Sequence, residues 1–130
     1  MKKGFIVNIE KETLENTDYR RVLYTAKNCQ LVVMNIEPGD EIGEEVHELD
    51  QFIRIEEGVA KVILNKTEEH ELKDDFAVII PADTSHNVIN TGDVPLKLYS
   101  IYSPPEHKGS TVHVTKESEQ EEHFDGVTTE

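Results

Sequence analysis

The sequence predicts an all-β fold, a barrel or sandwich of short strands. Segments rich in β-branched and aromatic residues recur at short intervals along most of the chain. Gly, Pro, Asn and Asp, which favour turns, separate these segments. No segment combines the length of a buried helix with an apolar stripe at helical spacing. About nine short strands without a long helix are typical of barrels and sandwiches.

The strands are predicted where alternating or continuous apolar runs lie between turns. Residues 4–9 (GFIVNI) predict a terminal strand, which can pair within its own sheet or with a second subunit. Residues 11–18 are polar and turn-forming, with one helical turn as the alternative. The other predicted strands span residues 20–26, 30–36, 51–56, 59–65, 70–72, 76–80, 86–90 and 96–102.

The sequence changes character near its C-terminal end. Residues 116–122 are acidic, and Ser118 and Glu121 have the spacing of a capping box, but no apolar stripe accompanies them. We therefore predict a β-barrel domain over residues 1–105, including the N-terminal strand. It is followed by a loop and a short acidic C-terminal tail over residues 106–130, either helical or disordered.

Composition and charge exclude several classes of function. The chain has 130 residues, 36% hydrophobic and 31% charged, which is typical of one globular domain. It contains no apolar run of membrane-spanning length and no signal-peptide pattern. The formal charge of −14, from 13 basic and 27 acidic residues, repels nucleic-acid phosphates and anionic membranes. We expect no nucleic-acid partner, no membrane partner and a cytoplasmic location.

The single cysteine, Cys29, cannot form an internal disulfide, so nothing indicates an oxidising compartment. It lies in the sequence NCQLVV. This apolar context favours a buried structural thiol over a catalytic one.

Metal-capable side chains gather in residues 38–58, PGDEIGEEVHELDQFIRIEEG. Glu45, His47 and Gln51 are two and then four positions apart, so in an extended chain with alternating side chains they point to one face. The segment DFAVIIPADTSHNVIN supplies His86 after an apolar run and a proline turn. We interpret the two segments as parts of one site.

The spacing of these residues resembles the two motifs of the cupin family. The first motif is matched by Gly39, Glu45, Val46, His47, Gln51 and Gly58, and the second by Asp75, Pro81, Asp83, His86 and Asn90. Glu45 and Gln51 stand where the family usually has His and Glu, and Asp75 and Asp83 stand where it usually has Gly. The resemblance implies a cupin double-stranded β-helix, or jelly-roll barrel, a homodimer and a small-molecule ligand inside the barrel.

The resemblance also implies that Glu45, His47, Gln51 and His86 occupy the four metal-ligand positions. Two imidazoles, a carboxylate and an amide oxygen suit a divalent transition metal, namely Zn, Mn, Fe, Ni or Co. The exchange of ligand types at positions 45 and 51 conserves the net charge of the site. Glu45 is also the candidate catalytic residue, because a carboxylate can move a proton.

Four functions are consistent with such a site. The first is an enzyme like phosphomannose isomerase, in which the metal acts as a Lewis acid on a polar, sugar-like metabolite during isomerisation or proton transfer. The others are a metal-dependent dioxygenase, a non-catalytic module that binds a metal or small ligand, and a vestigial site. In the vestigial case Glu45 pairs with a cation such as Arg54 or Lys61.

Other polar residues receive structural interpretations. Arg54 has the opposite parity to Gln51, so it is expected to face away from the site. Asn90 is expected to hold backbone groups through its side chain. At most one of Tyr99 and Tyr102 can face the cavity, and core packing is expected for both. The segment after residue 105, which contains His107 and His113, is expected to be a solvated loop, with a lid over the barrel mouth as the alternative.

Overall fold

The structure is a computed structural model that describes residues 2–120 and 122–130. Its strands are β1 (Arg20–Thr25), β2 (Gln30–Ile36), β3 (Asp50–Glu57), β4 (Ala60–Leu64), β5 (Glu68–Leu72), β6 (Ala77–Ile80), β7 (His86–Asn90), β8 (Leu96–Ser103) and β9 (Val112–His113). The helical elements are α1 (Ile9–Glu15) and the 3-10 helix η1 (Lys116–Ser118).

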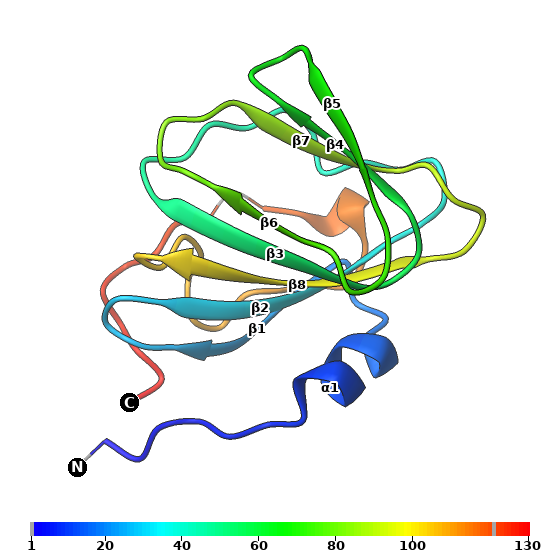
Figure 1. Ribbon diagram of the computed structural model, residues 1–130. Helices are drawn as coiled ribbons and strands as arrows, with labels where there is room; N and C mark the ends of the chain where they lie inside the picture. Colours follow the sequence, from blue (N-terminus) through cyan, green and yellow to red (C-terminus); the bar gives the residue numbers. More distant parts are fainter. Residues whose placement is uncertain (1, 121) are drawn as a thin grey trace.

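Two antiparallel sheets form the fold (Figure 1). The larger sheet has the order β6-β3-β8-β2-β1-β9, and the smaller has the order β5-β4-β7. The predicted strands from residue 20 to residue 102 correspond to β1 through β8, so the all-β prediction is confirmed. The boundaries are predictable because each strand lies between residues that favour turns.

The core lies between the two sheets. Inward-facing aliphatic side chains such as Met34 on β2, Ile53 on β3, Val62 on β4, Val88 on β7 and Leu98 on β8 are fully buried. Burial of each such side chain contributes roughly 1.5–3 kcal/mol. The alternation of buried and half-buried residues along β3 and β7 follows the two-residue period of a strand with one face toward the core.

The predicted N-terminal strand over residues 4–9 is wrong. Asn8 caps helix α1 by accepting a hydrogen bond from the Lys11 N–H at 3.1 Å, and Ile6 is 99% exposed. Strand β9 pairs with the edge of β1 at which an N-terminal strand could otherwise pair. In the described part of the chain, no helix has the length and apolar character needed to cross a membrane.

Of the two states expected for the acidic tail, the structure contains a short helix, η1. Thr115 and Ser118 form a capping box at its start, whereas the predicted box with Glu121 includes a residue outside the described part. The tail also packs on the barrel, since β9 pairs with β1 and the Thr129 N–H donates to the Thr25 carbonyl at 2.8 Å. The domain boundary at residue 105 stays a prediction.

The prediction of a buried cysteine is wrong. Cys29 is exposed and lies in the turn between β1 and β2, where its carbonyl accepts a hydrogen bond from the Ala26 N–H at 2.9 Å. The apolar run that suggested burial begins only with the strand that follows. A thiol in a turn that precedes a strand does not share the burial of that strand.

Candidate metal centre

A short antiparallel bridge brings the two sequence segments of the site together. Glu45 and His86 exchange two backbone hydrogen bonds of 2.9 Å each, one in each direction. This pairing lies outside β3, which begins at Asp50. Glu45 and His47 therefore precede the strand that carries Gln51, and the predicted single extended face is replaced by a bridge and a turn.

His47 is held next to Glu45 by both its backbone and its side chain. Its carbonyl accepts a hydrogen bond of 2.7 Å from the N–H of Asp83, which has a left-handed φ of 65°. Its Nε2 lies 2.8 Å from Glu45 Oε2. Burial alone lowers the pKa of His47, but the hydrogen bond to Glu45 and the nearby carboxylates raise it above its usual value.

His86 presents an unpaired nitrogen to the site. Its Nδ1 lies 3.0 Å from the Thr84 carbonyl, and because a carbonyl only accepts hydrogen bonds, Nδ1 carries the proton. Its Nε2 is then a bare lone pair, and it is buried with no hydrogen-bond partner among the described residues. Burial lowers the pKa of His86, and the nearby His47 acts in the same direction, so the ring is neutral near pH 7.

Gln51 points into the barrel from the inward face of β3. Its amide is 3% exposed, and its Nε2 donates to Ser100 Oγ at 3.3 Å. Its Oε1 is buried and has no hydrogen-bond partner among the described residues. An unpaired buried amide oxygen is costly. It is a suitable oxygen ligand for a metal, and its role as the fourth ligand stays a prediction.

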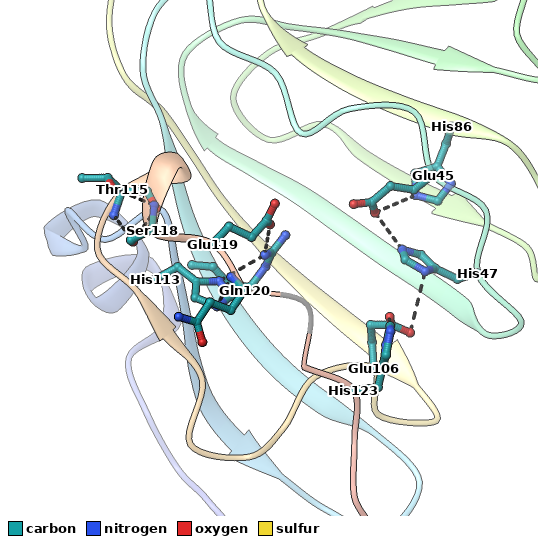
Figure 2. Close-up of polar contacts among 11 residues, drawn as sticks. Glu45, His47, His86, Glu106, His113, Thr115, Ser118, Glu119, Gln120 and His123 are labelled. Carbon is teal, nitrogen blue, oxygen red and sulfur yellow. Dashed lines mark hydrogen bonds and ion pairs between the residues drawn. The ribbon is translucent and has the colours of Figure 1, made fainter.

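Glu45, His47 and His86 form a group that can hold a metal ion. One ligand atom from each lies within 4.8 Å of the others, and Glu45 Oε2 lies 4.0 Å from His86 Nε2. Figure 2 shows the three side chains converging. Two imidazoles and a carboxylate suit a divalent transition metal, and the unpaired Nε2 of His86 would lose its desolvation cost on coordination. The donor set fits the metal that the motifs imply.

Residues after β8 complete the surroundings of the site. Glu106 Oε2 lies 3.7 Å from His47 Nδ1, and Glu106 Oε1 lies 3.2 Å from His123 Nδ1 (Figure 2). His107 packs its ring edge-on against Tyr102, with a centroid distance of 5.1 Å. Glu106, His107 and His123 line a pocket of about 290 Å³ together with Glu45 and His47. The segment therefore covers the site, where a solvated loop was expected.

The sequence carries no signal for Glu106, which directly follows two prolines, or for His123, which lies in an acidic, polar run. Arg20, which also lines the pocket, was predicted only as part of a strand. Arg20 is two positions from the half-buried Val22, so both side chains share one face of the strand, and this could have placed Arg20 inside the barrel. However, Leu23 is apolar on the opposite parity, so the pattern was ambiguous.

Of the remaining structural interpretations, those of Arg54 and Asn90 are confirmed, and core packing holds for Tyr102 but not for Tyr99. Arg54 faces away from the site and pairs with Asp75 at 2.9 Å. Tyr102 is buried inside the barrel, whereas Tyr99 faces outward and is half-buried.

Neither cation named for a vestigial site pairs with Glu45. Arg54 contacts Glu56 and Asp75, and Lys61 contacts Glu69. That version of the vestigial hypothesis is wrong.

Comparison with known proteins identifies relatives of the chain. A family model described as the cupin domain matches residues 32–102, which include the four predicted ligands. The chain is 48% identical over 120 residues to the protein YrkC of Bacillus subtilis, covering 88% of this chain but only 64% of YrkC. It is 41% identical over 116 residues to the protein L612 of Acanthamoeba polyphaga mimivirus, covering 86% and 72% of the two chains.

Solved structures share the fold. The crystal structure of BH2720 from Bacillus halodurans is 49% identical, with a TM-score of 0.87 over 89% of this chain and 92% of that one. A cupin superfamily protein, DSY2733 from Desulfitobacterium hafniense, is 20% identical, with a TM-score of 0.62 over 69% and 80%. The predicted jelly-roll fold is thus confirmed. Because the family model matches more than half of the sequence, the chain belongs to the cupin family.

Proposed function

We propose that the chain binds a divalent transition metal through Glu45, His47 and His86, with Gln51 as a fourth ligand, and acts on a polar, sugar-like metabolite. The bound metal would act as a Lewis acid on a carbonyl or hydroxyl group of the metabolite. The metal is Zn, Mn, Fe, Ni or Co on the chemistry of the ligand set. The proposed reaction is an isomerisation or a related proton transfer.

The unpaired Nε2 of His86 is the observation that supports this proposal most strongly. The hydrogen bond from Nδ1 to the Thr84 carbonyl fixes both the ring orientation and the tautomer, as is typical of histidines that ligate metals. The free lone pair is buried beside Glu45 and His47. Leaving such an acceptor unpaired costs roughly 1–3 kcal/mol. A metal ligand bond would remove this cost.

Glu45 is the proposed proton carrier. Both of its contacts with the imidazoles use Oε2, so Oε1 is left to accept a proton from a bound metabolite. The Glu45 side chain is 31% exposed and lines the pocket, which gives a metabolite access to it. Glu106 can hold the His47 ring in place from the other side, because its Oε2 lies 3.7 Å from His47 Nδ1.

Metal analysis tests the proposed ligand set. The protein is purified without chelator, its metal content is measured by mass spectrometry, and the metal-free form is titrated with each of the five candidate ions. His86→Ala should lose metal affinity by at least roughly tenfold. His70→Ala is the matched control, because His70 is exposed on β5 and belongs to neither motif. Equal metal affinity in wild type and His86→Ala would contradict the proposal.

Two further measurements address the alternatives. Oxygen uptake by the iron-loaded protein on candidate substrates would favour the dioxygenase over the isomerase, and metal binding without any turnover would favour a binding module.

The homodimer, which the family resemblance implies, is proposed here as well. Light scattering should give twice the monomer mass of 14.8 kDa, and the monomer mass would contradict it.

A further inference from the structure

Arg20 is a buried cation that the proposed metal chemistry does not use. It is the first residue of β1, and its side chain is only 4% exposed. It lines the same pocket as Glu45 and His47. Among the described residues that line this pocket, Arg20 is the only Lys or Arg. A guanidinium buried in this way costs several kcal/mol unless it is paired.

The pairing of Arg20 is incomplete. Its Nη1 donates to the Glu119 carboxylate and lies 3.3 Å from His113 Nδ1. Its Nε is buried and has no hydrogen-bond partner among the described residues. A guanidinium presents parallel N–H groups that match both oxygens of a carboxylate. Glu119 uses one oxygen, Oε2, so part of this donor fork is unfilled.

The Glu119 side chain is held by its ion pair with Arg20. Glu119 follows η1, and its side chain is 32% exposed, so water screens its ion pair from one side. The Gln120 N–H also points at His113, with its N lying 3.3 Å from Nε2. A neutral imidazole has one lone pair, so His113 can accept from Arg20 or from Gln120 but not from both. In the described part of the chain the Glu119 carboxylate pairs only with Arg20, so displacing this carboxylate breaks one ion pair.

We propose that Arg20 binds the carboxylate group of an anionic metabolite and that Glu119 occupies this position when the metabolite is absent. This inference rests on the proposed function, because it places the metabolite in the pocket that the proposed ligands Glu45 and His47 line. It narrows the substrate class from polar, sugar-like molecules to sugar acids and similar small carboxylates. The pocket volume of about 290 Å³ suits a ligand of that size.

The charges of the pocket favour this exchange. Glutamates such as Glu44, Glu45 and Glu106 also line it, so an added anion is repelled unless it replaces one of them. A metabolite carboxylate that displaces Glu119 leaves the charge next to Arg20 unchanged. Its second oxygen can also accept from Nη2 while the first accepts from Nη1, whereas Glu119 uses a single oxygen. Arg20 thus distinguishes a carboxylate from a neutral group of the same size.

Calorimetric titration of the full chain with D-glucuronate and D-glucose tests the proposal, because these sugars differ in the carboxylate. Glucuronate should bind at least roughly tenfold more tightly than glucose. Glu119→Gln should bind glucuronate roughly tenfold more tightly than wild type, because it removes the competing charge. Glu117→Gln is the matched control, since Glu117 is exposed two residues away, and it should bind like wild type. Arg20→Gln should lose the preference for glucuronate.

A change at Arg20 can also affect folding. If Arg20→Gln does not fold, the comparison of Glu119→Gln with Glu117→Gln tests the proposal on its own. Equal glucuronate affinities in those two variants, no glucuronate binding to either, or a folded Arg20→Gln that still prefers glucuronate would each overturn the proposal. Zinc binding is measured in the same samples. If zinc fails to bind while glucuronate affinity still depends on Glu119, the proposed function fails and this inference stands. If zinc binds but Glu119→Gln leaves the glucuronate affinity unchanged, the proposed function stands and this inference fails.

Discussion

Asn90 offers a direct test of how the second motif is held in place. Its side chain is buried, and its Nδ2 donates to the carbonyls of Ile36 and Val94, both at 2.9 Å. Its Oδ1 accepts from the Gly92 N–H at 2.9 Å. One amide therefore joins the end of β2 to the turn between β7 and β8. We expect its replacement to destabilise the fold without removing any metal ligand.

The size of the effect follows from these three hydrogen bonds. Asn90→Ala removes all of them and leaves three backbone groups without their partners. At about 1 kcal/mol for each bond, the free energy of unfolding should fall by about 3 kcal/mol. Asn90→Asp keeps the acceptor for Gly92 but turns a carboxylate toward two carbonyl oxygens. At neutral pH it should be at least as destabilising as alanine.

Urea unfolding at pH 7 measures both variants. With a slope of about 1.5 kcal/mol/M, Asn90→Ala should lower the midpoint by about 2 M. Asn28→Ala is the control, because Asn28 is exposed, and it should change stability by less than about 0.5 kcal/mol. Acidification should recover part of the Asn90→Asp loss, because a protonated Asp can donate one bond again. A loss below about 1 kcal/mol for Asn90→Ala at unchanged slope would refute the reasoning.

Two further predictions concern pH and backbone strain. Burial lowers the pKa of His107 from 6.5 to about 2, so the unfolded chain binds a proton below pH 6.5 that the folded chain does not. This residue should therefore reduce stability by about 1.4 kcal/mol between about pH 7.5 and about pH 5.5. His107→Phe, which keeps the packing on Tyr102, should lose this contribution to the pH dependence of stability in urea titrations. An unchanged pH dependence would contradict the prediction. Gly58 has φ of 101°, and an added Cβ would lie 3.2 Å from Leu96 Cα. Gly58→Ala should cost about 1–3 kcal/mol, and more than Gly39→Ala, where φ is 83° but the space is open; equal losses would rule out the clash.

Much of the barrel could be predicted from the sequence because its information is local. The alternation of apolar residues along β3 and β7 gives both the strand and the face that points inward. Asp83 illustrates a turn residue, since Asp tolerates the left-handed φ of 65° found there. The motif spacing predicted that Glu45, His47 and His86 would meet, although a bridge and a turn bring them together.

The parts that could not be predicted depend on contacts between distant residues. The pairing of β1 with β9 joins Arg20 to His113, and the ion pair of Arg20 with Glu119 spans 99 positions. No local pattern encodes such partners. The same pairing explains the missing N-terminal strand, because β9 takes the edge of β1. The positions of the polar side chains that cover the site therefore could not be predicted from the sequence and are known only from the structure.

Burial gives a physical reason for the exchange of ligand types between the two positions of the first motif. The cupin pattern has a carboxylate at the position of Gln51, which is 3% exposed here. A carboxylate there would lose its hydration and would depend on the metal to offset its charge. At position 45 the carboxylate side chain is 31% exposed and stays in contact with water and with His47. The exchange keeps one negative charge for a divalent cation and moves it to where it is stable with or without that cation.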